Sequence, residues 1–307
     1  MKKTLSIISI CLCLCLCIAI AFVGCTNTQS EKEILVISRE AGSGTRDAFD
    51  GLIKNSAGDS LAKKSDGSAY ESSIFVSSLN MQSGTSAVIT KVASTVNAIG
   101  YISLGSVDDT IKAISVDGVS PSASTVLDGT YALKRPFVIM TKKGLDLTAA
   151  SADFMKYLKS KQAQTIVDAN KYVKQENSDQ VDYVAPASAI TGSVILKGST
   201  SVEPLMQKLI ADYQTKGGTN VTGVAFDLDA QGSSAGISAT KADIEGTVIG
   251  MSSSALKAAD AESLDAFNIA LDAVAIIVNK ENTITNLTVA QIFDIYTGKI
   301  TKFSEIG

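Results

Sequence analysis

Three loops in this sequence carry the residue types that bind a small anion. They cover residues 38–46, 198–204 and 231–236, are rich in Gly, Ser and Thr, and each lies between an apolar segment and a segment with helical spacing. A helix N-terminus presents unpaired N–H groups and the positive end of the helix dipole, so an anion is stabilised there. Glycine lets the backbone approach a ligand closely, and hydroxyl groups add hydrogen-bond donors without bulk.

The first loop also contains a cation, Arg39, at the end of its apolar segment. A guanidinium group presents a planar fork that pairs with two oxygens of a tetrahedral anion. Ordinary helix capping explains a single loop that contains Ser or Thr. Three such loops in one chain, one of them with an arginine, predict a shared binding site for a small oxyanion.

The composition argues against catalysis and against a bound metal or cofactor. The chain has no His, and its five Cys all lie at or before Cys25. The remainder therefore lacks the commonest metal ligand and the commonest general base. Gly232, Ser234 and Gly236 match the spacing of a hydrolase nucleophile elbow, but that motif needs a base to accept the hydroxyl proton. We expect a protein that is not an enzyme, with a Ser–Lys hydrolase as the remote alternative.

The first 25 residues have the pattern of a bacterial lipoprotein signal. Lys2 and Lys3 precede an apolar run over 5–23, which ends at Gly24-Cys25. We expect residues 1–24 to be a signal peptide, Cys25 to carry palmitate and diacylglycerol, and 25–33 to be a tether on the outer face of the cell membrane. The alternative is an uncleaved membrane anchor, because the run is close to the roughly 20 residues that span a bilayer.

The rest of the chain is long enough for two domains and has a mildly acidic surface. There are 27 Lys and Arg against 31 Asp and Glu, and the signal accounts for two of the cations. A nucleic-acid partner requires a basic face, so none is expected. Short strands rich in Val and Ile alternate with amphipathic helices, which predicts an α/β architecture with mainly parallel sheets. The expected strands cover 34–37, 99–103, 137–141, 194–196, 221–226, 248–251 and 274–278, and the expected helices 47–53, 205–213, 237–241 and 289–296.

The loops and several shorter segments closely resemble the phosphate-binding proteins of bacterial ABC importers, which have the type II periplasmic-binding-protein fold. The resemblance implies two lobes with a ligand cleft between them, and capture of inorganic phosphate for the permease subunits of an importer by a monomer. Sensing or scavenging of phosphate without transport is an alternative. The matching segments are 38–46, 99–101, 128–131, 135–136, 198–206, 232–237, 249–253, 286–288 and 297–300.

The order of these segments differs from the order that is usual in the family. Members usually begin with the Gly-Ser-Thr-Ser strand and carry the arginine loop in the middle, whereas here the arginine loop comes first. A circular permutation through a linker at 175–191 explains this order, and a truncated tandem fusion is the alternative. The permutation predicts a discontinuous lobe, 34–112 plus 279–307, with the arginine loop, and a continuous lobe, 113–278, with the Ser- and Thr-rich loops.

The resemblance also assigns individual residues to the anion site. Phosphate keeps a proton near neutral pH, so a selective site needs a hydrogen-bond acceptor as well as donors. Some relatives have a carboxylate in the stretch equivalent to 248–254, where this chain has only serines. Ser253 is therefore the expected acceptor, with Asp272 as an alternative, and sulfate or a related oxyanion remains an alternative ligand. The implied contacts are Arg39, Ser43, Gly44 and Thr45 from one lobe and Thr200, Ser201 and Ser233 from the other.

Overall fold

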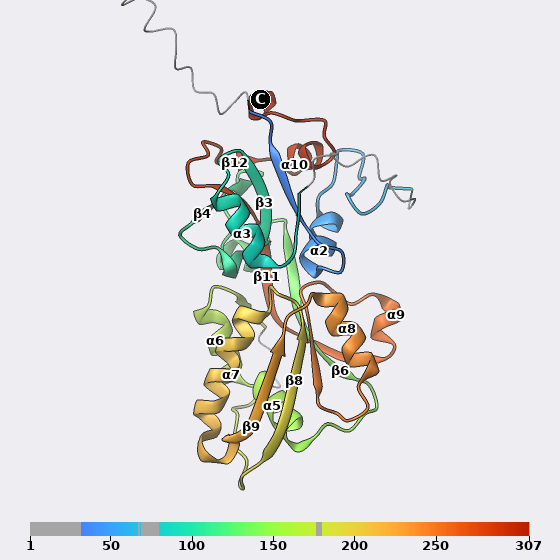
Figure 1. Ribbon diagram of the computed structural model, residues 1–307, viewed down its shortest axis with the longest axis vertical. Coiled ribbons are helices and arrows are strands. Elements are labelled where there is room, and N and C mark those ends of the chain that lie inside the picture. Colours follow the sequence, from blue (N-terminus) through green and yellow to red (C-terminus); the bar gives the residue numbers. More distant parts are fainter. Residues whose placement is uncertain (1–31, 67, 69–79, 176–179, 307) are drawn as a thin grey trace, which may run out of the picture.

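The chain folds into two lobes, one above the other in Figure 1. The computed structural model describes residues 32–66, 68, 80–175 and 180–306. The expected signal peptide and Cys25 lie outside these residues. Within the described ranges, no helix combines the length and the apolar character needed to cross a membrane.

The first lobe, at the top of Figure 1, is built around β1 (Leu35–Arg39). Its hydrophobic cluster joins Phe49, Tyr101 and Tyr296, which are buried and in ring contact. The other elements of this lobe are β2 (Asn80–Gln82), β3 (Ala98–Ser103), β4 (Ile111–Ala113), β5 (Ser115–Val116), β12 (Asn286–Leu287), α2 (Gly44–Leu52), α3 (Thr85–Ala93), α4 (Ala123–Leu127), α10 (Val289–Tyr296), η2 (Leu104–Ser106) and η4 (Phe303–Glu305).

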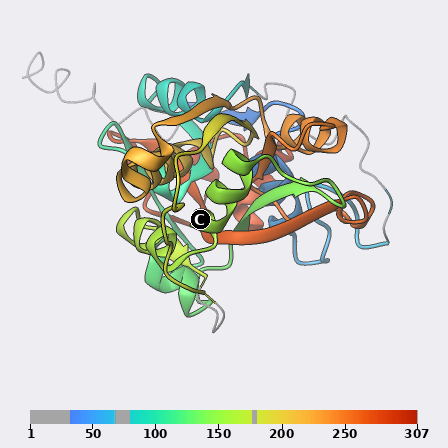
Figure 2. The same cartoon turned by 90° about the horizontal axis from the view of Figure 1, so that it is seen from below.

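The second lobe is built around β8 (Thr191–Gly198), and in the view from below helices lie on both sides of its strands (Figure 2). Its cluster includes Phe154, Leu196 and Tyr213. The other elements are β6 (Lys134–Lys142), β7 (Val173–Lys174), β9 (Gly223–Asp229), β10 (Val248–Ser252), α5 (Ala149–Leu158), α6 (Lys161–Ala169), α7 (Glu203–Gly217), α8 (Ser233–Ala242), α9 (Ala258–Ala261) and η3 (Gly218–Val221).

One long strand, β11 (Leu264–Asn279), belongs to both lobes. The sheet order is β2-β1-β3-β11-β6-β10-β8-β9. Pairs at both ends of this order are parallel, but β11 is antiparallel to β3 and to β6, and β6 is antiparallel to β10. The α/β prediction is confirmed, whereas the expectation of mainly parallel sheets holds only for the two ends.

The seven strands predicted from the sequence are all present. Most are buried in the sheet, whereas β9, at its edge, is largely exposed or half-buried. The prediction missed the first half of β11, where exposed and buried residues are mixed. It also missed the polar edge strand β2. The described part of the expected linker is 175 and 180–191, and it has no helix or strand except at Thr191, where β8 begins.

The cluster around β1 draws on three separate parts of the sequence. It contains Ile34 and Phe49 near the start, Ile114 and Tyr131 in the middle, and Phe293 near the end. Residues 114–133 and 273–278 therefore pack with the arginine-loop side of the molecule in this structure. The lobe boundaries expected at 112/113 and 278/279 stay a prediction.

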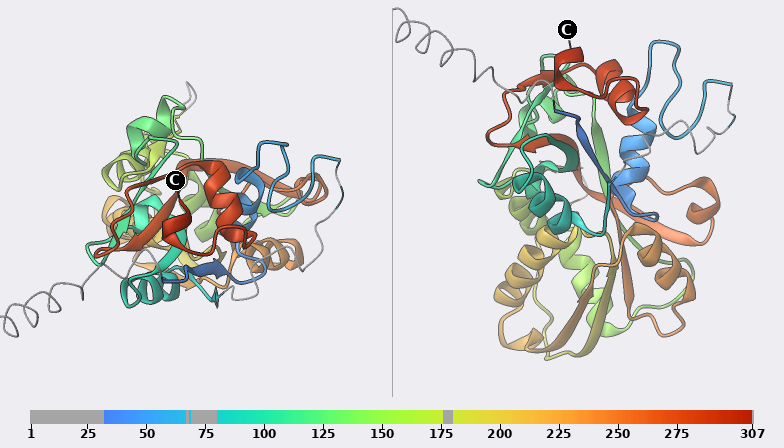
Figure 3. Two further views of the ribbon diagram at one scale, coloured as in Figure 1. Left: turned by 90° about the horizontal axis from the view of Figure 1, so that it is seen from above. Right: turned by 45° about the horizontal axis from the view of Figure 1, so that its top comes forward.

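The two ends of the described chain lie side by side on the first lobe. The Ile34 amide donates to the Thr301 carbonyl at 2.7 Å. The backbones of Glu33 and Lys302 form an isolated antiparallel β-bridge. In the view from above, the C-terminal elements lie over this end of the lobe (Figure 3).

Candidate anion-binding site

The three loops named in the sequence converge where the two lobes meet. Each follows the carboxyl end of a strand and leads into a helix: β1 into α2, β8 into α7, and β9 into α8. The Ser43 side chain caps α2 by accepting a hydrogen bond from the Arg46 amide. Gly232, at the start of α8, has φ of 101°, a conformation that favours glycine.

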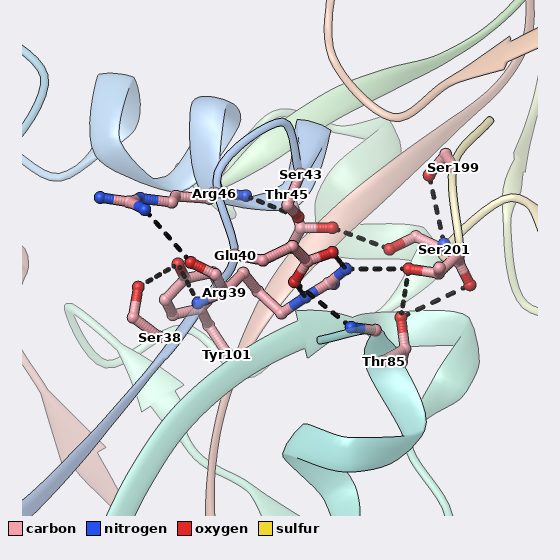
Figure 4. Close-up of polar contacts among 12 residues, drawn as sticks. Ser38, Arg39, Glu40, Ser43, Thr45, Arg46, Thr85, Tyr101, Ser199 and Ser201 are labelled. Carbon is pink, nitrogen blue, oxygen red and sulfur yellow. Dashed lines mark hydrogen bonds and ion pairs between the residues drawn. The ribbon is translucent and has the colours of Figure 1, made fainter. Parts of the chain in front are cut away.

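Arg39 is buried at the centre of this junction, with 1% of its surface exposed. Its Nη2 donates to Thr200 Oγ1 at 2.9 Å, which joins the first lobe to the second (Figure 4). Its Nη1 is buried and has no hydrogen-bond partner among the described residues. Buried donors in native proteins are rarely left unpaired, so this nitrogen is available for a guest.

Glu40 holds the Arg39 guanidinium in place and was not named by the sequence reasoning. Arg39 Nε and Nη2 donate to its two carboxylate oxygens, both at 2.8 Å (Figure 4). The Gly84 amide donates to the same carboxylate at 3.3 Å. Burial opposes ionisation of Glu40, but the hydrogen bonds and the charge of Arg39 outweigh it, so its pKa is lowered. Arg39 therefore faces a bound anion as part of an ion pair with Glu40, whose net charge is zero and whose orientation is fixed by hydrogen bonds.

Direct contacts between loops close the two lobes onto each other. Thr45 Oγ1 lies 2.8 Å from Ser201 Oγ, and both side chains are buried. The Ser234 amide donates to the Gly42 carbonyl at 3.1 Å. A cavity of about 380 Å³ lies beside these contacts, with Thr200 in its wall. The arginine loop and the two loops of the second lobe thus form one junction.

Ser233 and Ser253 form the wall of the second lobe that faces Gly44. The Ser253 amide donates to Ser233 Oγ at 3.1 Å, and the two hydroxyl oxygens lie 3.4 Å apart. A Cβ atom placed on Gly44 would lie 2.3 Å from Ser233 Oγ and 2.8 Å from Ser253 Oγ. Only glycine at position 44 allows this approach of the α2 N-terminus to the serines.

Asp272 is not among the residues that these loops bring together. It lies in β11, opposite Arg135 in β6, and both side chains are buried. Arg135 Nε and Nη2 donate to its Oδ2 at 3.1 and 3.0 Å. Burial raises the pKa of Asp272, and the charge of Arg135 opposes that shift. The structure therefore gives this carboxylate an arginine as its main partner.

The site offers chiefly donors: a guanidinium, several hydroxyls and the amides at the starts of α2, α7 and α8. Across the described ranges, no group of three or more Asp, Glu, Cys or His is placed to hold a metal ion. Lys197, in β8, pairs with Asp229, and Lys241, in the same helix as Ser234, pairs with Asp260. This arrangement suits the binding of an anion rather than the activation of a serine nucleophile.

Comparison with known proteins finds relatives over most of the chain. Phosphate-binding protein PstS 2 of Streptococcus pneumoniae is 39% identical over 277 residues, which are 89% of this chain and 87% of the relative. Phosphate-binding protein PstS 2 of Streptococcus agalactiae is 34% identical over 293 residues, 92% of each chain. A model of the PBP superfamily domain matches residues 184–307.

A solved structure is similar over nearly the same extent. The crystal structure of a phosphate-binding protein of a phosphate ABC transporter from Streptococcus pneumoniae is 37% identical and has a TM-score of 0.65. The match covers 90% of this chain and 100% of that one. The circular permutation expected from the segment order is not confirmed by these comparisons.

Proposed function

This chain belongs to the family of PstS phosphate-binding proteins, and we propose that it captures inorganic phosphate between its two lobes for delivery to an ABC importer. The observation that carries the proposal is the position of Arg39. Its guanidinium is buried at the lobe junction, is held by Glu40, reaches Thr200 and keeps Nη1 without a partner among the described residues. A buried, oriented cation with a spare donor is what a small multiply charged oxyanion requires.

The guest would be bound from both lobes at once. The first lobe would contribute Arg39, Ser43, Gly44 and Thr45, and the second Thr200, Ser201, Ser233 and Ser253. Contacts such as Thr45 to Ser201 support this arrangement, because they show that both sets of donors reach one place. Binding would then be coupled to lobe closure, with phosphate adding further bonds across the junction.

The shortage of hydrogen-bond acceptors among the proposed contacts supports sulfate as a second candidate ligand. Glu40 accepts hydrogen bonds from Arg39 and Gly84, and Asp272 lies in β11 opposite Arg135 rather than in the three loops, so neither carboxylate is the acceptor that we propose for the phosphate proton. Ser253 is the acceptor that we propose, since a hydroxyl both donates and accepts. An anion without a proton, such as sulfate, makes no use of this acceptor and is the second candidate.

We further propose that the protein acts outside the cytoplasm as a monomer without catalytic activity. The Lys2-Lys3 start, the apolar run and Cys25 support a cleaved signal peptide and a lipid anchor in the cell membrane. The relatives named above are binding proteins, one of them of a phosphate ABC transporter, which supports permease subunits as the partner.

Titration calorimetry tests the ligand. Purified protein from Thr26 onward is titrated with phosphate, with sulfate and with buffer alone, at low and moderate salt. We expect phosphate to bind in the micromolar range or tighter, which corresponds to about 8 kcal/mol or more. Absence of heat with phosphate, or tighter binding of sulfate, would reject phosphate as the ligand.

A further inference from the structure

The ion pair between Arg135 and Asp272 lies where the pairing of β11 changes from β6 of the second lobe to β3 of the first lobe. Asp272 is opposite Arg135 in the β11–β6 pairing, and Val274, two residues later, is opposite Ser103 in β3. The first half of β11 therefore pairs with the second lobe and the last part with the first. The ion pair is therefore at the junction between the two lobes.

The pair is buried but incompletely satisfied. Arg135 Nη1 and Asp272 Oδ1 have no hydrogen-bond partner among the described residues, and the same holds for the hydroxyls of Ser103 and Tyr172. Strand pairing brings these side chains together, because Ser103 is opposite Val274, two residues after Asp272, and Val173, the residue after Tyr172, is opposite Leu271. The four side chains thus form one buried polar cluster.

Strand pairing places this cluster beside the arginine loop, because β1 ends at Arg39 and runs parallel to β3, and Ser103 at the end of β3 pairs with Val274 of β11. Burial lowers the pKa of Arg135, Asp272 opposes that shift, and the positive charge of Arg39 lowers the pKa further. Arg39 carries a buried nitrogen without a partner among the described residues, as Arg135 does. Each of the two guanidinium groups has its own carboxylate, Glu40 for Arg39 and Asp272 for Arg135.

We propose that Arg135 and Asp272 are positioning residues of the anion site, an internal charge pair that sets the electrostatic field at Arg39 and so tunes the affinity for phosphate. The inference rests on the proposed function. A buried ion pair adds little to stability, since desolvation of both charges offsets their attraction. Its charges act over a longer range than its hydrogen bonds, because a low-dielectric interior screens them weakly.

The proposal makes opposite predictions for the two halves of the pair. Asp272→Asn leaves the positive charge of Arg135 uncompensated, which attracts a dianion. Arg135→Gln leaves the carboxylate of Asp272, which repels it. The double variant is neutral again and keeps two amides that can hydrogen-bond to each other. A pair that acted only by bracing the strands would give weaker binding in both single variants.

The test is phosphate titration of the purified wild type and the three variants at pH 6 and pH 8. At pH 8 we expect Asp272→Asn to bind phosphate about fivefold tighter or more, and Arg135→Gln about tenfold weaker or more. We expect the double variant to return to within about threefold of the wild type. Both single effects should shrink at pH 6, where phosphate carries less charge.

Other ionisable groups face the Asp272 carboxylate and belong to the same comparison. They are Arg135 from β6, and Tyr172 and Tyr131 from the neighbouring segments. Burial raises the pKa of both tyrosines, and Asp272 raises it further. Both tyrosines stay neutral from pH 6 to pH 8, so a change between these pH values reports on phosphate and on the pair.

Asp153→Asn is the matched control, because Asp153 is another buried carboxylate with two partners, the hydroxyls of Tyr183 and Tyr213 at 2.7 and 3.0 Å. It should lower stability and leave phosphate affinity unchanged. Equal weakening by both single variants, without recovery in the double variant, would overturn the proposal. If Arg135→Gln does not fold, the proposal is overturned by Asp272→Asn alone, should that variant bind phosphate as tightly as the wild type or more weakly. A wild type that does not bind phosphate would refute the proposed function instead.

Discussion

Arg39 Nη2 lies 2.9 Å from Thr200 Oγ1, although 161 positions separate the two residues in the sequence. The hydrogen bond crosses from the first lobe to the second and connects two of the three anion-binding loops. A charged donor that already spans the junction needs little rearrangement to receive an anion. The pairing of Arg39 with Glu40 supplies that order before any guest arrives.

Substitution of Arg39 should cost most of the affinity for phosphate. Arg39→Ala removes a charged hydrogen-bond donor and leaves Glu40 as an uncompensated carboxylate beside the anion, so binding should weaken by at least about 1.5–3 kcal/mol. Arg39→Lys keeps the charge but loses the planar fork, so its phosphate affinity should lie between those of the wild type and Arg39→Ala. Calorimetry measures both.

Arg46→Lys is the control for this experiment. Arg46 pairs with Asp50 in the same helix at 3.3 Å and is partly exposed. A lysine keeps the positive charge beside Asp50, and Arg46 is not among the residues that we propose to contact phosphate. Phosphate affinity should change little. If Arg39→Ala binds phosphate as tightly as the wild type, Arg39 is not part of the binding site.

The contact between Gly44 and the serines of the second lobe makes a separate prediction. In Gly44→Ala the new methyl group would overlap Ser233 Oγ, whose rotation would break its bond to the Ser253 amide. We expect phosphate binding about tenfold weaker or more, an effect of about 1.4 kcal/mol. Small-angle scattering should also show a larger radius of gyration with phosphate than the wild type has.

Gly51→Ala provides a matched substitution in the same helix, since a Cβ at position 51 meets no atom within 4 Å. Alanine is the better helix former by roughly 0.5–1 kcal/mol, so this variant should be as stable as the wild type or slightly more stable. It should bind phosphate normally. Equal affinities of the two alanine variants would show that the lobes do not need the close approach at Gly44.

The proposed role of Ser253 as acceptor for the phosphate proton makes a prediction about selectivity. Ser253→Ala removes the hydroxyl but keeps the amide that donates to Ser233 Oγ. If the hydroxyl accepts the phosphate proton, the variant should lose about 1 kcal/mol or more with phosphate, the net value of a hydrogen bond, and less with sulfate. Competition titrations measure the ratio. An equal loss with both anions would mean that Ser253 only donates.

Much of the site could be predicted because its parts are local in sequence. Each loop joins a buried strand to a helix, and that local pattern already contains the donors and the glycine. Glu40 was missed because residues i and i+1 on a strand point to opposite faces, and the pair forms only because β1 ends at Arg39. The loop expected at 38–46 did not indicate that the Glu40 carboxylate would turn back onto Arg39.

The partner of Asp272 could not be found from the sequence either. Arg135 lies 137 positions away, and only the register of β6 against β11 places the two opposite each other. The first half of β11 has no clean alternation, so its pairing could not be assigned before the fold was known. Pairs of residues that lie far apart in sequence and meet through strand register are not revealed by local patterns.

Asp50 makes the stability of the first lobe depend on pH. Burial raises its pKa to about 6, although Arg46 opposes the shift. The folded state therefore holds the proton more tightly than the unfolded chain, where the pKa of this carboxyl is 3.8. The stabilisation is complete below about pH 4, is lost as the pH rises to about 6, and does not change above that.

Asp50→Asn removes this titration. Relative to the variant, the wild type should lose stability between pH 4 and about 6.5, by at most about 3 kcal/mol at roughly 1.4 kcal/mol per pKa unit. Urea unfolding across this range measures the difference. Asp128→Asn is the control with the opposite sign, since hydrogen bonds from Thr130 lower the pKa of that exposed carboxyl. Parallel stability curves for the wild type and Asp50→Asn would show that Asp50 ionises as freely in the folded protein as in the unfolded chain.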